Sequence, residues 1–471
     1  MRSSAAGQGQ RQSIGRRMAR SLGVFRAPAK PVSVKGGAAA ALALLLALPG
    51  CGAFSSSGDS AATNVAQGQE GFVRGFLGYA VADEPRAAVT ARSVLSSGGN
   101  AADAATAAGL MMAVTLPSRA GLGGGGACLV FDPRRGGTEA IVFPPGARQA
   151  APRGADRPAA VPMLARGLFA LHARNGSGNF EVLTAPAEAA ARLGTDVSRA
   201  LATDLAAVAG PLLADPWAAA VFAGPGGRPL TLGDRLVQPD LGATLASLRT
   251  AGVGDLHQGA MARRVAEASV PAGGGLTVEE LRASVPRVAP PVQVVRGTDT
   301  ISFLPADVPG GQASADAFAG QAPAAAGALP ASAGLVVVDR NGMAVSCAFT
   351  MNNLFGTGRV APGTGILLAA APGIGQVRPP LLAAGIAHVP NTRAFRAAAA
   401  GSGQAAAPVA VGGALAAAMR GADATTALAG VPEPGRGLLV TCPRTLPGVA
   451  ESCTAAADPR GAGLALGSSE R

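Results

Sequence analysis

The stretch from 330 to 368 holds the residues of this chain that are best placed for chemistry. Its sequence, PASAGLVVVDRNGMAVSCAFTMNNLFGTGRVAPGTGILL, is typical of two β-strands joined by a turn and followed by a glycine-rich loop. Ser332 stands at the front of the first strand, and Thr350 and Asn352 lie at the end of the second. A serine hydroxyl can attack a carbonyl when a base activates it. The alternative is that Ser332 is only the first polar residue of a strand.

Thr350 and Asn352 are expected to act together. Side chains two residues apart on a strand lie on the same face, so both can reach one site. The alternative is that they satisfy only local backbone groups at the end of the strand. The three histidines, His172, His257 and His388, are scattered and lack the spacing of metal ligands. We therefore expect no metal and no other cofactor.

Two further motifs of catalytic sites are missing. No G-x-S-x-G elbow of a serine hydrolase is present. The glycine run from Gly121 to Gly126 means that its backbone approaches another segment or a ligand closely. A phosphate-binding loop is disfavoured there, because no G-K-[ST] and no helix follow.

The positive charge of the chain is concentrated at its start. The formal net charge is +11, and residues 1–50 hold eight basic residues and no acid, which leaves +3 for residues 51–471. No later basic stripe with interleaved aromatics replaces them, so we expect no nucleic-acid partner. With 471 residues, 48% of them hydrophobic, the chain can bury a large core in one or two domains.

The first 51 residues are typical of a bacterial export signal. The apolar run from Gly36 to Pro49 is shorter than the ~20 residues that a transmembrane helix needs. It ends in Leu48-Pro49-Gly50-Cys51, which resembles a lipobox, so we expect lipidation of Cys51 and a lipoprotein anchored in the cell envelope or periplasm. The alternative is an ordinary secretory signal with an incidental cysteine. Residues 52–75 are expected to form a flexible tether.

The remaining cysteines fall into two pairs. Cys128 and Cys347 lie inside apolar, strand-like runs, and we expect both to be buried as small hydrophobic residues. Cys442 and Cys453 flank a loop that contains proline and glycine, which makes a disulfide between them reasonable in an exported chain.

Helices and strands are expected in alternation around the reactive stretch. Asp83 can cap a helix that has Pro85 in its first turn, and Asn100 can cap a second one, with Asp103 completing a capping box. The second helix is expected to end near Pro117, and the strand ACLVFD follows the glycine run.

The middle of the chain is expected to be helical. Residues 166–283 are rich in alanine and leucine, and we expect amphipathic helices that cover a sheet. Short strands are expected at 292–295 and 300–304. The composition of 307–330 predicts an exposed linker that is open to cleavage.

Several of these segments together carry a resemblance to a known family. The runs SSGGNAADAATAAGLMMAV and AGLGGGGACLVFD, then GDRLVQPDLGATLASLRTAG, then DRNGMAVSCAFTMNNLFGTGRVAPGTGILL, follow one another in the order of the gamma-glutamyltranspeptidase signatures. The likeness runs from about Gly78 to Leu368. It implies an α+β fold, the four-layer αββα sandwich of the N-terminal nucleophile (Ntn) hydrolases.

The resemblance also implies self-cleavage. Members of the family are made as one chain and cut themselves before a threonine, whose hydroxyl is the nucleophile and whose freed α-amine is the base. That position falls on Ser332 here, so cleavage is expected between Ala331 and Ser332. The parts would be a large-subunit-like region, 76–331, and a small-subunit-like region, 332–471.

Further roles follow from the same resemblance. Thr350 matches a threonine that supports the nucleophile, and Asn352 matches a substrate-binding asparagine. The glycine pair whose amides form the oxyanion hole corresponds to Gly401 and Gly403. Ala333 and Gly334, however, stand where the family shows threonine and histidine.

The family's clamp for a γ-glutamyl group is missing. Its carboxylate-binding arginine is replaced by proline in Phe143-Pro144-Pro145, and no acid stands near Ile374, where an aspartate would hold the amino group. The paired serines correspond to Leu381-Leu382-Ala383. A buried charged contact is worth ~2–5 kcal/mol, and each 1.4 kcal/mol is about tenfold in affinity, so γ-glutamyl binding should be weaker by several orders of magnitude.

Three functions remain open. The first is an Ntn amidohydrolase or acyltransferase that uses Ser332 on another small-molecule amide or peptide. The second is an uncleaved, catalytically inactive pseudoenzyme that serves as an envelope-tethered binding or scaffold protein. The third is a glutathione hydrolase with a rearranged clamp. The sequence leaves the oligomeric state open.

Overall fold

The computed structural model describes residues 75–148, 152, 154–321, 331–374 and 377–467. These residues all belong to the compact unit that begins at Ala62. The predicted export signal, the lipidation site Cys51 and nearly all of the predicted tether lie outside the described residues. Within the described part of the chain, no helix is both long enough and apolar enough to span a membrane.

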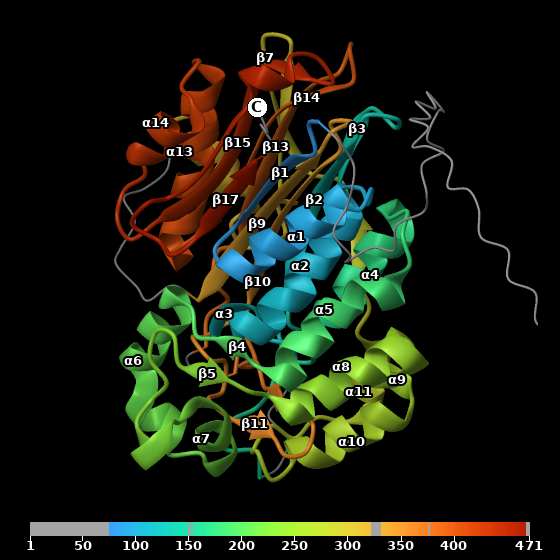
Figure 1. Cartoon of the computed structure of the whole chain (residues 1–471), viewed down its shortest axis with the longest axis vertical. Coiled ribbons are helices and arrows are strands. Elements are labelled where there is room, and N and C mark those ends of the chain that lie inside the picture. Colours follow the sequence, from blue (N-terminus) through green and yellow to red (C-terminus); the bar gives the residue numbers. More distant parts are fainter. Residues whose placement is uncertain (1–74, 149–151, 153, 322–330, 375–376, 468–471) are drawn as a thin grey trace, which may run out of the picture. The chain divides into compact units, whose positions relative to one another are not determined.

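Two antiparallel β-sheets form the centre of the fold (Figure 1). The first sheet has the order β17-β1-β9-β10-β2-β3-β6, with β1 (Gly78–Ala82), β2 (Gly125–Asp132), β3 (Gly137–Phe143), β6 (Arg287–Ala289), β9 (Ser332–Asp339), β10 (Ala344–Thr350) and β17 (Leu464–Gly467). The second has the order β16-β15-β14-β13-β8-β7, with β7 (Val292–Arg296), β8 (Asp299–Phe303), β13 (Ala383–Val389), β14 (Ala394–Ser402), β15 (Arg436–Leu446) and β16 (Thr454–Ala457).

The two sheets stack face to face because each strand alternates its side chains between two apolar layers. On β9, Val336 and Val338 belong to the core between the sheets, whereas Leu335 and Val337 belong to the core under the helices. Strand β14 does the same, with Ala398 and Ala400 in the core between the sheets. This alternation shows which side chains of each strand face the space between the sheets.

Helices cover the outer face of each sheet. Helices α1 (Pro85–Ser96), α2 (Ala101–Thr115) and α4 (Leu164–Asn175) pack on the first sheet, and α5 (Phe180–Leu193) packs on α2. Helices α12 (Gly311–Phe318), α13 (Ala407–Met419) and α14 (Ala424–Ala429) cover the second sheet. The predicted α+β, four-layer αββα sandwich is confirmed.

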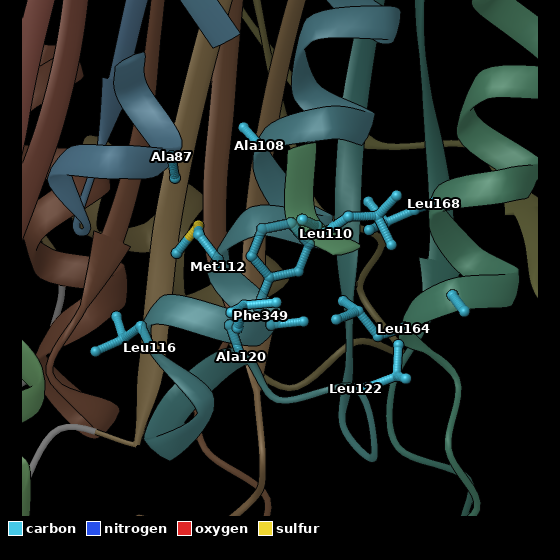
Figure 2. Packing of buried hydrophobic residues seen from close by; sticks show 14 of the residues in the cluster. Ala87, Ala108, Leu110, Met112, Leu116, Ala120, Leu122, Leu164, Leu168 and Phe349 are labelled. Carbon is cyan, nitrogen blue, oxygen red and sulfur yellow. The ribbon is translucent and has the colours of Figure 1, made fainter. Parts of the chain in front are cut away.

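Helix α2 is the centre of the first helical layer. All fifteen of its residues are buried, and its small side chains allow close packing against β9, β10 and α4. Figure 2 shows buried side chains of this layer gathered around Phe349 of β10. The predicted capping box is present: the Asn100 side chain accepts from the Asp103 amide, and the Asp103 side chain accepts from the Asn100 amide.

The remaining helices extend beyond one end of the sheets (Figure 1). They are α3 (Pro117–Ala120), α6 (Arg199–Leu213), α7 (Pro216–Phe222), α8 (Pro239–Ala251), α9 (Val253–Gln258), α10 (Ala260–Ser269) and α11 (Val278–Ala283), with the short strands β4 (Thr195–Asp196), β5 (Arg235–Leu236), β11 (Val360–Ala361) and β12 (Ile366–Leu367). The helical prediction for 166–283 is confirmed, but among its described helices only α4 packs closely on one of the two central sheets. The helices from α6 to α11 instead pack mainly on one another and on α3 and α5.

Two local predictions were wrong. Glu84, not Asp83, caps α1: its side chain accepts from the Ala87 amide at 2.9 Å and from the Thr115 hydroxyl at 2.7 Å. The predicted linker contains α12, because the alanine-rich segment buries one face, including Ala315 and Phe318, against the second sheet and α13.

The cysteines form two disulfides. The bond between Cys442 and Cys453 agrees with the prediction for that loop. Cys128 and Cys347 are fully buried as expected, but they are bonded to each other rather than free. The reason is strand register, since β2 and β10 place these two residues directly opposite each other.

Candidate active site

Ser332 and Thr350 meet at one end of the sandwich. Ser332 is the first residue of β9, Thr350 is the last of β10, and the register pairs them directly. Ser332 shares its strand face with Val336 and Val338, so its side chain faces the space between the sheets. The side chain is fully buried, and its Oγ has no hydrogen-bond partner among the described residues. Buried hydroxyls without partners are uncommon, and such a group is often found at a functional site.

The Thr350 hydroxyl is held in one orientation. Its Oγ1 accepts a hydrogen bond from the Asn352 amide at 2.8 Å and donates to the Ala331 carbonyl oxygen, also at 2.8 Å. Its proton is therefore directed at the carbonyl of the peptide bond between Ala331 and Ser332. A donor at that oxygen is suited to stabilising the negative charge that would develop there if the carbonyl were attacked.

Asn352 lies beyond the end of β10, so the prediction that it shares a strand face with Thr350 is wrong. It has a φ of 64°, in the left-handed region, so the same-face rule for strands does not apply to it. Its Nδ2 donates to the Ala370 carbonyl at 2.8 Å, and the side chain is buried. Asn352 thus ties the end of β10 to the segment around Ala370 and, through its amide, orients Thr350.

Asp83 joins the site from the neighbouring strand. It follows β1, and its Oδ2 accepts from the Gly334 amide at 2.7 Å while its own amide donates to the Gly334 carbonyl at 3.2 Å. Burial raises the pKa of Asp83, and a nearby Asp458 adds to this, although the Gly334 amide, Arg119 and Ser402 counteract part of the increase. The carboxyl group therefore takes up a proton at a higher pH than an exposed aspartate does.

Ser402 reaches the same end from the second sheet. It is the last residue of β14 and lies on the face that carries Ala398 and Ala400. A side chain added at Gly334 would meet Ala400 at 3.0 Å, so Gly334 and Ala400 face each other across the sheets. The two strands run in opposite directions, since Ser346, the partner of Val336, bonds to Ala399. The Ser402 hydroxyl also acts on the Asp83 carboxyl, which bonds to Gly334, two residues after Ser332.

Arg119 closes this end of the sandwich. It lies on α3, is buried, and holds Asp204 of α6 with two hydrogen bonds, from Nε at 2.7 Å and from Nη2 at 2.6 Å. Burial alone would lower the pKa of Arg119, but the Asp204 carboxylate outweighs it and the pKa is raised. The guanidinium also acts electrostatically on Asp83.

The proposed oxyanion glycines lie on and just after β14. Gly401 pairs with Ala383 and Gly437 inside the second sheet, and a side chain there would meet the Ala407 carbonyl at 2.7 Å, on the α13 side. Gly403 follows the strand with a φ of +110°. Their role as amide donors stays a prediction.

The missing clamp is not replaced by the arginine that is nearest to it in sequence. A side chain at Gly125, the partner of Thr350, would meet Pro145 at 2.7 Å, so the clamp position lies near the candidate site. Arg148, three residues after Pro145, is buried and binds Glu280 and the carbonyls of Ala159, Gly274 and Gly275. Its guanidinium is thus used to hold these loops together.

The described residues contain no group of three histidine, cysteine, aspartate or glutamate side chains that could bind a metal. Each histidine has a structural setting: His172 bonds to Asp103 at 3.1 Å, His257 bonds to the Leu281 carbonyl at 3.2 Å, and His388 stacks on Phe131.

The architecture of the chain is shared with a solved structure. A cephalosporin acylase from Bacillus halodurans has the same fold, with a TM-score of 0.69 at 17% identity over 84% of this chain and 96% of that one. The fold is that of an Ntn hydrolase, with the candidate hydroxyl at the start of a central strand.

The sequence comparisons point to one family. The model of the family described as Gamma-glutamyltranspeptidase matches residues 87–319. Glutathione hydrolase proenzyme of Escherichia coli (strain K12) is 30% identical over 231 residues, 45% of this chain and 39% of that protein. Glutathione hydrolase 7 of Homo sapiens is 34% identical over 245 residues, 48% of this chain and 36% of that protein. Residues 87–319 are thus similar to the gamma-glutamyltranspeptidase family, and the chain spans less than half the length of these relatives.

Sequence reasoning missed three residues of the candidate site. From the sequence, Asp83 is expected only to cap a helix, Ser402 stands only within a glycine pair, and no pattern marks Arg119. The contact between Asp83 and Gly334 joins positions 251 residues apart. No local pattern marks such a contact, because the pairing of β1 with β9 creates it.

Proposed function

We propose that this chain is an Ntn amidohydrolase or acyltransferase that cuts itself between Ala331 and Ser332. The observation that carries the proposal is the Thr350 hydroxyl, which donates to the Ala331 carbonyl oxygen beside the unpartnered Ser332 hydroxyl. The products would be a large part that contains the large-subunit-like region, 76–331, and the small part, 332–471.

Self-cleavage would proceed through an ester. The Ser332 Oγ attacks the Ala331 carbonyl carbon, and the charge that develops on the oxygen is stabilised by the Thr350 hydroxyl. The carbon–nitrogen bond then breaks, the Ser332 nitrogen takes the proton lost by the hydroxyl, and an ester links Ala331 to the Ser332 Oγ. Water hydrolyses the ester, which leaves a carboxylate on Ala331 and a free amine and hydroxyl on Ser332.

The free Ser332 amine would serve as the base in later turnovers. In its neutral form it takes the proton from the Ser332 Oγ as the oxygen attacks a substrate amide, and it returns the proton to the leaving amine. Water or another amine then takes up the acyl group. Asn352 is proposed as a substrate contact, and Gly401 and Gly403 as donors to the oxyanion.

The substrate is proposed to be a small amide or peptide other than a standard γ-glutamyl compound. Proline stands at the family's arginine position, and Arg148 is already bound to Glu280 and three carbonyls. A γ-glutamyl head group would thus lack a charged partner there. Export, with lipidation at Cys51 and attachment to the cell envelope, is part of the proposal and rests on the sequence of residues 1–51.

One observation favours the inactive alternative. Ala331 and Ser332 are both completely buried, which suits an uncut chain that serves as a binding or scaffold protein. The two functions differ in the covalent state of the mature protein, so that state is the quantity to measure.

The test is a reducing, denaturing gel with intact-mass analysis of the purified full chain. We expect two fragments that meet between Ala331 and Ser332, and a single chain for Ser332→Ala. Ser346→Ala is the matched control, because Ser346 is another buried serine on the face between the sheets but bonds to the Ala399 carbonyl. It should still be cut.

A single intact wild-type chain would exclude the self-cleaving enzyme and leave the binding protein. For the third possibility, cleaved protein should be assayed with glutathione. If cleaved, folded protein does not turn glutathione over, it is not a glutathione hydrolase.

A further inference from the structure

The second sheet has a free edge at β7. This strand is the last in the order of its sheet, and among the described residues it pairs only with β8. In an antiparallel pair every second residue directs its amide and carbonyl groups at the neighbouring strand, so the other residues of β7 direct theirs away from the sheet. Proteins usually protect such an edge with charges, proline or a covering segment. Val295, near the end of β7, is instead 73% exposed.

An open cavity of about 550 Å³ lies beside this edge. Its lining comes from the end of β7, from the end of α12 with the two residues that follow it, and from α13 with Arg420 after it. Apart from two arginines, the lining consists of apolar side chains and glycines. The volume lies within the range of about 300–1,000 Å³ that is found for ligand sites.

The charge in the cavity has one sign. The lining contains Arg296 and Arg420 and no acidic residue. Both arginines are exposed, and neither has a carboxylate partner within the described part of the chain. Arg296 instead lies over the ring of Phe318, with its Cζ 5.9 Å from the ring centroid. An acidic group on a bound partner would therefore be attracted to the arginines without displacing an existing ion pair.

The arginine at the end of β7 follows apolar side chains on the same face of the strand. Val292 and Val294 pack against the core beneath α12 and α13. Side chains two residues apart on a strand lie on one face, which places Arg296 on this face as well, in agreement with its contact with Phe318 of α12. A strand added beside β7 would thus meet two apolar positions and then a positive one, at every second residue.

We propose that the free edge of β7 and this cavity form a docking site for an extended peptide with two apolar side chains and one acidic side chain on the same face. Its backbone would bond to the outward amide and carbonyl groups of β7, and its carboxylate would pair with Arg296 and Arg420. A second copy of β7 fits less well, because that strand offers valine, glutamine and arginine but no acid. The inference goes beyond the proposed function and does not depend on it, since strand addition requires no reaction at Ser332.

The test is the binding of a designed peptide to the full chain. The probe is Thr-Val-Thr-Val-Thr-Glu-Thr, labelled with fluorescein at its start and amidated at its end, and its binding is followed by fluorescence anisotropy. In an extended peptide its two valines and its glutamate lie on one face. The control peptide, Thr-Val-Thr-Val-Glu-Thr-Thr, has the same composition but carries the acid on the other face. We expect the control to bind at least fivefold more weakly than the probe.

Variants of the chain locate the bound peptide. A Cβ added at Gly413 of α13 has no neighbour within 4 Å, so Gly413→Leu can extend into the cavity and should weaken binding at least tenfold. Gly210→Leu in α6 is the matched control, because Gly210 is another exposed helical glycine with open space at its Cβ position. Arg420→Gln should weaken binding several-fold, whereas Arg263→Gln, at an exposed arginine outside the cavity, should not. Thermal unfolding checks that each variant is folded.

Absence of probe binding, or equal weakening by Gly413→Leu and Gly210→Leu, would overturn the inference. A wild-type chain that forms dimers in light scattering, and that Gly413→Leu makes monomeric, would assign the cavity to a second copy and reject the peptide partner. A synthetic peptide of residues 322–330 that displaces the probe at a lower concentration than the unlabelled probe does would assign it to the chain itself, and would also reject that partner.

Discussion

At the scale of single residues, the Thr350 hydroxyl has the best-defined geometry in the candidate site. It accepts from the Asn352 amide, so its one proton is left for the Ala331 carbonyl. Asn352 is held in turn by the Ala370 carbonyl and by its left-handed backbone. Asn352 and Ala370 thus orient the Thr350 hydroxyl towards the peptide bond that is proposed to break.

Replacing Thr350 by valine keeps the shape of the side chain and removes this donor. We expect cleavage between Ala331 and Ser332 to slow by about 10²–10³-fold, as is found when one oxyanion donor is removed. The measurement is the fraction of cut chain against time on reducing gels, after expression and purification in the cold.

Thr350→Ser is the control, because it keeps the hydroxyl, and it should be cut at a rate nearer to that of the wild type. Both variants should be shown to be folded by thermal unfolding. A valine variant that is folded and cut at the wild-type rate would show that the Thr350 hydroxyl does not assist the reaction.

At the scale of elements, the ion pair between α3 and α6 holds the end of the sandwich together. Arg119 and Asp204 are buried, and the Ser118 hydroxyl also donates to Asp204 at 2.7 Å. Removing one partner of such a pair leaves an uncompensated buried charge, which costs about 3–5 kcal/mol.

Asp204→Asn should therefore lower the free energy of unfolding by an amount of that order, measured by urea titration. Asp234→Asn is the matched control, because its pair with Arg228 is exposed, and it should change stability little. Equal effects of the two substitutions would mean that the buried pair does not hold α3 and α6 together.

The helical region also contains a pH-sensitive residue, His257 of α9. Burial, and then the charge of Arg166, lower its pKa to about 4, although the bond to the Leu281 carbonyl acts in the opposite direction. The unfolded chain binds a proton near pH 6.5, so it takes up protons that the folded chain does not. The titration of His257 therefore lowers the free energy of unfolding as the pH falls below about 6.5. The decrease is complete below about pH 4.

His257→Gln removes this titration. The stability of the variant relative to the wild type should rise by up to about 3 kcal/mol as the pH falls from about 6.5 to about 4, measured by urea unfolding. Buried acids with raised pKa values, such as Asp83 and Asp339, act in the opposite direction but are the same in both proteins. A stability difference that is independent of pH would contradict the account.

At the scale of the whole molecule, the two proposed fragments would stay joined after cleavage. Cys128 lies before the Ala331–Ser332 bond and Cys347 lies after it, and the two form a disulfide 219 residues apart in sequence. Strand β9 of the small part also lies between β1 of the large part and β10 in one sheet. Cutting the chain would therefore release no part of the fold.

We expect one band on a non-reducing denaturing gel and two on a reducing gel. The double variant Cys128→Ala/Cys347→Ala should give two bands on both, whereas Cys442→Ala/Cys453→Ala should behave as wild type, because that bond lies within the small part. Peptide mapping of the unreduced protein tests the Cys128–Cys347 bond even if the chain is not cut. Free thiols at these positions would contradict the prediction.

The sequence by itself determined the layers of the fold and the position of the candidate hydroxyl. The Asn100–Asp103 cap, the two strands on either side of the turn that contains Asn341 and Gly342, and the order of the family motifs all depend on local patterns, which periodicity and turn chemistry make readable. The Cys442–Cys453 bond could also be predicted from the sequence, because it closes a short loop.

Only the tertiary structure decided which side chains surround Ser332. The contacts of Asp83 with Gly334, of Arg119 with Asp204 and of Cys128 with Cys347 join residues that are 85 to 251 positions apart. Gly334 faces Ala400, and Ser402 lies next to Asp83, only because the two sheets stack in one particular register. Strand register and sheet stacking follow from packing over the whole core, and a short stretch of sequence does not contain that information.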